Sequence, residues 1–456
     1  MFKRFLKKLI PRKLLQLYHY CLAVLASYYY GRPSEKMIII GVTGTAGKTT
    51  VGYLIAQLLE LAGEPVGLSS TAIFKVADQE WLNDKKMTML GRFQTHRLLR
   101  QMVNAGCHYA VVETSSEGIL QFRHIGIHYD VGVFTNLTPE HLEAHGGFAN
   151  YKAYKLKLFK TLEKLPHKKL NGKIIPKSLI VNLDDSHAAD FLNFRVDQKI
   201  TYSTSEKLLR GVSPQPLVAV NIKADSNGLN FTIGKNNFHS PLIGRFNVYN
   251  NLAVIGVMKA LGFSLDQLVG LLPQTKPCPG RLEFIDAGQD FKVIVDYAFV
   301  PKALQGLYQA VESFKKPGSR VIQVLGSTGG GRDKTIRPQK GELAAEHADF
   351  VIVANEDPYD EDPLEIINQV ASGAKQKGKV EGRNLFKFLD RREGIATALS
   401  LAQKNDIVLI TGKGSEQAMV VKNNKLIPWD DRKVVREELK KLVITILCPS
   451  KPSSKY

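Results

Sequence analysis

The sequence predicts an α/β fold, with a P-loop-type parallel sheet in a central domain and a smaller Rossmann-like domain after it. Strand-like and helix-like segments alternate along most of the chain, which is typical of parallel sheets covered by helices. At 456 residues the chain is too long for one ordinary core. A proline-rich segment, Pro273–Gly280, separates two alternating series. We therefore expect an N-terminal segment (1–36), two domains (37–277 and 278–447) and a flexible tail (448–456).

The composition is that of a globular protein with a strongly basic surface. Hydrophobic residues make up 44% of the chain, which excludes a disordered protein. The four cysteines show no paired spacing and are expected to be isolated thiols in the cytoplasm. The formal charge of +19 indicates a solvated basic surface, anionic substrates or an anionic membrane. The chain lacks an aromatic-interleaved basic motif, so we expect no nucleic-acid partner.

The first 36 residues differ from the rest of the chain. Eight Lys and Arg residues oppose one Glu before residue 37, and the stretch from Leu14 to Tyr30 is mostly apolar. It is shorter than a span of ~20 apolar residues, and no clean signal-peptide cleavage site follows it. We expect an amphipathic helix. Two interpretations stay open: residues 1–30 contact the inner face of the membrane peripherally, or the helix packs on the following domain.

The central domain begins with the strand–helix alternation. Buried strands are expected at Ile38–Gly41, Tyr109–Glu113, Val131–Asn136 and Leu179–Asn182. Helices are expected at Val51–Ala62, Thr95–Ala105, Ala149–Lys164 and Asn247–Leu261. Residues 200–240 have the pattern of short antiparallel strands, with a hairpin turn at Asn227-Gly228.

The second domain repeats the alternation on a smaller scale. Strands are expected at Phe291–Asp296, Arg320–Leu325, Phe350–Ala354 and Ile407–Ile410, with helices at Pro301–Phe314 and Leu364–Ala371. Charged residues at strand ends or beside glycines mark the edge where α/β domains bind ligands.

The most informative motif is the run Gly-Thr-Ala-Gly-Lys-Thr-Thr at residues 44–50, which follows a β-branched strand. Glycines at 44 and 47 allow backbone N–H groups, with Thr45 and Thr50 beside them, to surround phosphate oxygens. Lys48 would contact the β- and γ-phosphates, and the Thr49 hydroxyl would ligate Mg²⁺. One departure from the usual spacing is Val42, where a glycine is expected.

This motif resembles the ATP site of the Mur ligases, and the resemblance is closest to the branch that adds the third residue of the peptidoglycan stem peptide. Similar segments follow in the family's order through residues 37–440: Glu113–Ser116, Thr135–His141, His145–Gly146, Tyr151–Lys155, Gly244–Asn250, Pro279–Arg281, Val295–Ala298, Gly329–Lys334, Asp357–Pro358, Gly412–Gly414 and Asp430–Arg432. The resemblance implies a cytoplasmic ligase that phosphorylates a carboxylate with ATP and then lets an amino acid displace the phosphate.

The resemblance also implies roles for individual residues. Glu113 and His141 would join Thr49 in holding Mg²⁺, and Lys155 would bind metal after carbamylation by CO₂. Alternatively, Lys155 is one of five lysines on a solvated helix, the others being Lys152, Lys157, Lys160 and Lys164. Lys48, His141, Lys155 and Arg332 would be catalytic.

ATP contacts are further implied for Asn250, Arg281 and Asp296, although Asn250 alternatively caps a helix. Substrate contacts are implied for Thr114, Ser115, Arg123, Asp357, Gly412 and Glu416.

Several departures bear on the substrate. Only about 37 residues precede the phosphate loop, so we expect the family's uridine-binding domain to be absent. Diaminopimelate-adding members have Asp-Asn-Pro-Arg where this chain has Glu-Asp-Pro-Tyr at 356–359, and the lost arginine removes a carboxylate clamp. Besides peptidoglycan synthesis, a ligase for another polymer such as a γ-glutamyl chain stays open. So does a nucleotide-binding scaffold without ligase activity.

Overall fold

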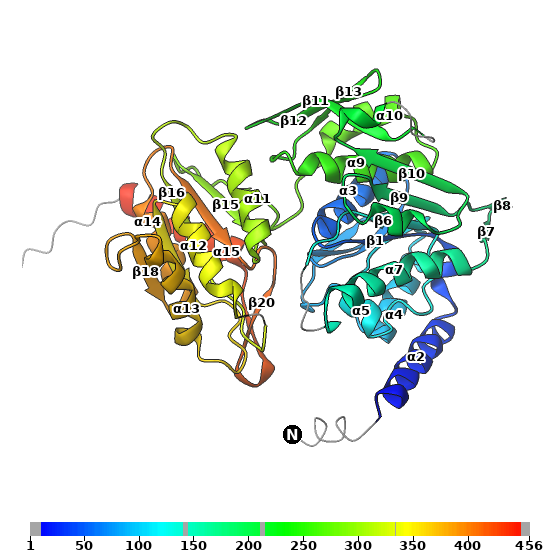
Figure 1. Cartoon of the computed structure of the whole chain (residues 1–456), viewed down its shortest axis with the longest axis horizontal. Helices are drawn as coiled ribbons and strands as arrows, with labels where there is room; N and C mark the ends of the chain where they lie inside the picture. Colours follow the sequence, from blue (N-terminus) through cyan, green and yellow to red (C-terminus); the bar gives the residue numbers. More distant parts are fainter. Residues whose placement is uncertain (1–10, 140–144, 210–214, 333, 448–456) are drawn as a thin grey trace, which may run out of the picture. The chain divides into compact units, whose positions relative to one another are not determined.

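The computed structural model describes residues 11–139, 145–209, 215–332 and 334–447, and the predicted tail and His141 lie outside them (Figure 1). The chain divides into two compact units, Met1–Lys276 and Pro277–Tyr456. Each unit is built on a sheet dominated by parallel pairs, so the predicted fold class is confirmed.

The first unit contains an eleven-stranded sheet with β1 (Ile38–Thr43) near its middle. In spatial order, the parallel part runs from β11 (Leu217–Asp225) through β10 (Gln198–Ser203), β9 (Ser178–Asn182), β6 (Val131–Phe134), β1 and β5 (Tyr109–Glu113) to β2 (Val66–Ser69). The antiparallel edges are β3 (Ile73–Val76) with β4 (Gln79–Leu82), and β12 (Gly228–Ile233) with β13 (Asn236–Ser240).

The predicted hairpin at Asn227-Gly228 is confirmed, because Asp225 pairs with Gly228 across β11 and β12. The expectation of antiparallel strands from residue 200 is wrong for β10, which pairs in parallel with β9. The connection from β9 to β10 contains the helix α8 (Ala188–Leu192), and a helical crossover returns the chain in the parallel direction.

Helices cover both faces of this sheet. On one face α3 (Lys48–Leu61) packs beside α9 (Asn247–Ala260). The opposite face carries α4 (Arg92–Asn104), α5 (Ser116–Leu120) and α7 (Phe148–Lys164), which share one apolar core. The remaining short elements are β7 (Lys169–Leu170), β8 (Lys173–Ile174), α10 (Leu265–Leu271), and the 3-10 turns η2 (Glu206–Leu209) and η3 (Leu272–Gln274).

The N-terminal helix α2 (Arg12–Tyr29), followed by the turn η1 (Pro33–Lys36), packs on the first unit (Figure 1). The Ser27 hydroxyl donates to the carbonyl of Gly126 at 3.2 Å, and the Arg100 guanidinium donates to the carbonyl of Tyr30 at 2.7 Å. The packing interpretation is therefore confirmed for one face of α2. In the part of the chain that the structure describes, every helix is too short or too polar to cross a bilayer.

The second unit contains a six-stranded sheet. The edge strand β14 (Glu283–Ile285) is antiparallel to β15 (Lys292–Asp296), and the parallel strands β19 (Ile407–Thr411), β16 (Val321–Leu325), β17 (Phe350–Ala354) and β18 (Leu385–Phe388) follow in spatial order. Its helices are α11 (Pro301–Glu312), α12 (Ile336–His347), α13 (Pro363–Gln376), α14 (Arg391–Leu401) and α15 (Asp431–Leu447). A hairpin of β20 (Ala418–Val421) and β21 (Lys425–Pro428), joined by η4 (Lys422–Asn424), completes the unit.

Candidate functional site

The phosphate loop leaves the carboxyl end of β1 and turns directly into α3. Gly47 has φ +83, a left-handed conformation that favours glycine, and α3 begins at the next residue, Lys48. The helix thus starts three residues before the predicted Val51, which puts Lys48 and Thr49 in its first turn. The Lys48 Nζ donates to the Thr45 carbonyl at 2.8 Å, so the ammonium folds back over the loop.

Gly44 shows why this loop must be glycine-rich. Its φ is +150, and a Cβ there would lie 1.9 Å from the Thr135 Oγ1. The Thr135 hydroxyl in turn donates to the Ala46 carbonyl at 2.7 Å, and the Ala46 N–H donates to the Asn136 side-chain carbonyl at 2.9 Å. The segment after β6 therefore holds the loop in shape, which leaves Lys48 and the helix N-terminus to face an anion.

Thr49 and Glu113 meet at the end of the paired strands β1 and β5. Val42 is in register with Glu113, and the Thr49 hydroxyl donates to the Glu113 Oε2 at 3.0 Å. The same oxygen accepts from the Thr71 N–H at 2.8 Å and from its hydroxyl at 3.0 Å. Thr71 was missed by sequence reasoning, because it lies 42 residues from Glu113 and in no recognised motif.

The two oxygens fit a Mg²⁺ ion. Neighbouring ligands of an octahedral Mg²⁺, with bonds of about 2.1 Å, lie about 3 Å apart. Thr49 and Glu113 already have that spacing, and Glu113 is 1% exposed. Among the described residues no group of three or more His, Cys, Asp and Glu side chains gathers at a metal-binding distance. Neighbouring Thr50 is buried in the first turn of α3.

Lys155 lies under the loop instead of on a solvated helix face. It is 1% exposed, its Nζ donates to the Gly44 carbonyl at 2.6 Å, and it sits 4.5 Å from the centre of the Tyr151 ring. Lys157 and Lys160 of the same helix are exposed, so the solvated-helix interpretation is wrong for Lys155. The Tyr151 hydroxyl lies 3.1 Å from the Thr45 Oγ1, which ties α7 to the loop a second time.

Asn250 approaches the phosphate loop from α9. A Cβ on Gly47 would lie 2.4 Å from the Asn250 Oδ1, so the amide packs directly on the loop. Its Nδ2 donates to the Asn247 Oδ1 at 2.6 Å. The capping alternative is wrong, because α9 begins at Asn247 and no side chain caps it.

The three predicted substrate residues of the first unit differ in position. Thr114 is fully buried, and its hydroxyl is bonded to Val112 and Tyr129 in the core. The Ser115 hydroxyl accepts from the Gly118 N–H and caps α5. The Arg123 guanidinium donates to the Met89 carbonyl, and burial lowers its pKa.

In the second unit, Arg281 and Asp296 flank Tyr297 at the end of β15. The Arg281 guanidinium lies 4.0 Å from the centre of the Tyr297 ring. The Asp296 carboxylate accepts from the N–H groups of Leu282 at 2.6 Å and Ala298 at 2.7 Å. Burial raises the pKa of Asp296, whereas Arg281 and these amides oppose that shift.

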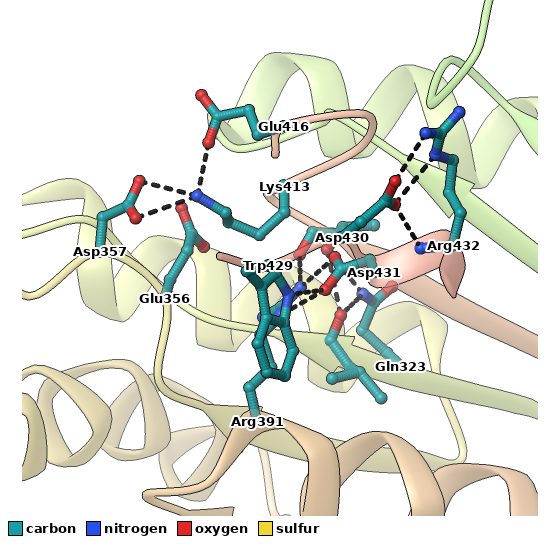
Figure 2. Close-up of polar contacts among 12 residues, drawn as sticks. Gln323, Glu356, Asp357, Arg391, Lys413, Glu416, Trp429, Asp430, Asp431 and Arg432 are labelled. Carbon is teal, nitrogen blue, oxygen red and sulfur yellow. Dashed lines mark hydrogen bonds and ion pairs between the residues drawn. The ribbon is translucent and has the colours of Figure 1, made fainter. Parts of the chain in front are cut away.

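Figure 2 shows a fully buried lysine, Lys413, surrounded by carboxylates. Its Nζ donates to both oxygens of Asp357 at 3.0 Å and to Glu416. Beside it, the Glu356 Oε2 is buried and has no hydrogen-bond partner among the described residues. A Cβ on Gly412 would lie 2.4 Å from that oxygen, so glycine is needed for the close approach. Sequence reasoning selected Asp357, Gly412 and Glu416 but missed the lysine that joins them.

A buried ion pair supports this cluster from below (Figure 2). The Arg391 guanidinium donates to both oxygens of Asp431, at 2.8 and 2.7 Å, and to the Thr411 carbonyl at 2.8 Å. The Trp429 indole N–H donates to the same Asp431 at 2.7 Å. Because Thr411 precedes Gly412, these bonds fix the end of β19 from which Gly412 and Lys413 project.

The Gly-rich segment after β16 carries Arg332, which is exposed, while Asp333 lies outside the described residues. Arg337, five residues on, is fully buried and donates to Glu361 at 3.0 Å and Gln369 at 2.7 Å. Sequence reasoning missed Arg337, because a single arginine in a helical pattern carries no signal of burial.

Comparisons with known proteins find the same family in both units. The Mur ligase middle domain matches residues 42–258, and the Mur ligase, glutamate ligase domain matches residues 280–414. The UDP-N-acetylmuramyl-tripeptide synthetase of Treponema denticola is 38% identical over 423 residues, which span 90% of this chain and 77% of that protein.

Solved structures with a similar fold include members of the same family. A UDP-N-acetylmuramoyl-L-alanyl-D-glutamate–2,6-diaminopimelate ligase is 28% identical with a TM-score of 0.58, covering 90% of this chain and 79% of that one. The Mycobacterium tuberculosis folylpolyglutamate synthase, solved with ADP and AMPPCP, has a TM-score of 0.65 over 93% of this chain and 95% of that one. At 14% identity this second likeness concerns the fold alone.

Proposed function

The chain belongs to the Mur ligase family, and we propose that it joins the carboxylate of a muramyl peptide to the amine of an amino acid, driven by ATP. The observation that carries this proposal is the meeting of the Thr49 hydroxyl and the Glu113 carboxylate, 3.0 Å apart, beside the phosphate loop.

The phosphate loop provides charge neutralisation for phosphoryl transfer. Backbone N–H groups from Gly44 to Thr49 and the Lys48 ammonium would surround the β- and γ-phosphates. Thr49 and Glu113 would hold Mg²⁺, which neutralises the charge that develops on the transferred phosphoryl group. The substrate carboxylate attacks the γ-phosphorus, and ADP leaves; the amine then attacks the acyl carbon of the acyl-phosphate, and inorganic phosphate leaves.

We also propose that Lys155 acts as a carbamate. The Lys155 ammonium first loses a proton; the neutral Nζ then adds CO₂ and releases a second proton, which leaves a carbamate anion. This anion would join His141 in holding a second Mg²⁺. The burial of Lys155 and its contact with Gly44 support a role at the phosphates instead of in solvent.

For the amino acid we propose a site at the carboxylate-rich cluster of the second unit, with Arg332 exposed nearby on the Gly-rich segment. An unpaired buried oxygen of Glu356 needs a donor, and the ammonium of an incoming amino acid is one. Tyr359 stands where diaminopimelate-adding members carry an arginine. We therefore expect an amino acid without a second carboxylate, such as lysine, to be preferred.

The test is amine-dependent release of phosphate from ATP by the full chain. The acceptor panel is UDP-N-acetylmuramoyl-L-alanyl-D-glutamate and a γ-glutamyl peptide, each with and without lysine or diaminopimelate. We expect release only with the muramyl peptide and an amine together, and its loss in Lys48→Ala. If phosphate is released with the γ-glutamyl peptide and an amine, but not with the muramyl peptide and an amine, the substrate is another polymer. ATP binding without turnover in every mixture would identify a scaffold.

We further propose that the protein works in the cytoplasm at the inner face of the membrane. The basic residues that precede α2 support this location, since cations near an anionic leaflet are attracted to it.

A further inference from the structure

The outer face of α2 is apolar although it is not covered. Six residues at helical spacing form what we call the outer stripe: Leu14, Leu17, Tyr18, Cys21, Leu25 and Tyr28. At 100° per residue they fall within a wedge of about 100°. The three leucines are each 57% exposed and Tyr28 is 63% exposed.

The inner face of the same helix accounts for its attachment. Ala23 and Ala26 are fully buried, and Ser27 bonds to Gly126. Arg100 donates to the carbonyls of Tyr30 and Gly31. The helix is therefore fixed on the first unit mainly by small residues and hydrogen bonds, while more than half of each leucine of the outer stripe stays exposed. A soluble helix held in this way normally exposes polar residues on its outer face.

We infer that the outer stripe of α2 is a docking surface for an anionic lipid bilayer. Residues 14–31 contain no Asp, Glu, Lys or Arg, whereas Lys3, Arg4, Lys7, Lys8, Arg12 and Lys13 directly precede them. An apolar, tyrosine-bearing face that follows a block of cations in the sequence matches the apolar interior, interfacial belt and anionic headgroups of such a surface.

A second copy of the chain is the competing occupant, because the stripe has the spacing of a coiled-coil seam. Paired helices in water carry charged residues along the flanks of the seam, where they set partner and orientation. In this helix residues 14 to 31 carry no charged side chain along either flank; the cations lie before and after them in the sequence, and the Arg32 guanidinium lies 5.5 Å from the centre of the Tyr28 ring. This arrangement favours the bilayer. The inference deepens the proposed location and adds a consequence: because α2 is fixed on the first unit, docking would orient the ATP site relative to the membrane.

The test is sedimentation of the full chain with vesicles of equal parts phosphatidylcholine and phosphatidylglycerol. We expect binding that weakens with salt and a partition coefficient reduced at least about tenfold by Leu17→Glu with Leu25→Glu. The matched control is Leu426→Glu with Ile427→Glu, two exposed apolar residues of β21, which should bind as the parent does.

Unchanged vesicle binding by the α2 double variant would overturn the inference. The inference would also be overturned if the parent did not bind vesicles and instead formed a dimer in analytical ultracentrifugation that the double variant abolished. Should the double variant unfold, Leu25→Trp decides: its emission should shift to the blue on vesicles, and an unshifted spectrum in a sedimenting protein would contradict docking through this face. Phosphate release is measured without vesicles, so failure of docking and failure of the ligase proposal are separate results.

Discussion

Glu113 is the residue on which the proposed metal site depends most. Its Oε2 is bonded to both Thr49 and Thr71, so the side chain is fixed before any ligand arrives. Glu113→Gln keeps the shape and one oxygen but removes the charge. We expect the Mg²⁺ concentration for half-maximal turnover to rise by about tenfold or more.

The control for this variant is Glu117→Gln, an exposed carboxylate in the first turn of α5. Titration of phosphate release with Mg²⁺ compares the two. An unchanged Mg²⁺ requirement in Glu113→Gln would remove Glu113 from the metal site.

Tyr359 is the residue that should decide between amino acids. It lies in a turn with φ +55, its N–H donates to the Val420 carbonyl at 3.2 Å, and its ring packs on Gly330. Tyr359→Arg would restore a guanidinium able to pair with a second carboxylate. We expect the ratio of kcat/KM for diaminopimelate to that for lysine to rise by at least about tenfold, since a charge-assisted pair contributes about 1.5–3 kcal/mol. Tyr359→Phe, which adds no charge, should leave the ratio unchanged; an equal change in both variants would contradict the assignment.

At the scale of elements, α2 and α4 both contact the loop formed by residues 122–128, and buried histidines lie at these contacts. His96 of α4 is fully buried, and its Nε2 lies 3.3 Å from the Ile125 carbonyl, beside Gly126 and Ser27. Burial lowers the pKa of His96 to about 4 from 6.5, and the bond to Ile125 opposes the shift only in part. Burial also lowers the pKa of His124 to about 4, with a contribution from Lys157.

These shifts predict acid lability. The unfolded chain binds more protons than the folded chain between pH 6.5 and 4, so stability is complete above 6.5 and is lost as the pH falls toward 4. His96 alone would account for up to about 3 kcal/mol of the free energy of unfolding. His96→Gln, which stays neutral, should show a smaller loss in urea unfolding across this range. Exposed His108→Gln should follow the parent, and identical pH profiles for all three would contradict the account of His96.

At the scale of the whole molecule, the local sequence pattern predicted those features that nearby residues determine, such as the bounds of single strands. The bounds of β5 and β17 match the expected Tyr109–Glu113 and Phe350–Ala354, because each is a short apolar run between turn residues. The phosphate loop and the family resemblance were likewise visible in consecutive residues, and the family is confirmed.

Contacts between distant segments could not be predicted in this way. Thr71 meets Glu113 only because β2 and β5 are neighbours, and Arg391 meets Asp431 only because α14 packs on α15. A polar side chain selected by a distant partner leaves no period or spacing in the sequence. The apolar residues of the outer stripe of α2 were evident in the sequence. The division of this helix into a packed face and an exposed face became visible only in the structure.

The most direct test of the ligase proposal traces an isotopically labelled oxygen atom from the substrate carboxylate to the released phosphate. UDP-N-acetylmuramoyl-L-alanyl-D-glutamate, labelled with heavy oxygen in its glutamate side-chain carboxylate, is incubated with ATP, lysine and the full chain. If an acyl-phosphate forms, amine attack expels phosphate that retains the oxygen bridging carbon and phosphorus. We expect mass spectrometry to find the label in inorganic phosphate in step with amide formation. Unlabelled phosphate, or phosphate released without any amide, would show that this chain does not work by carboxylate activation.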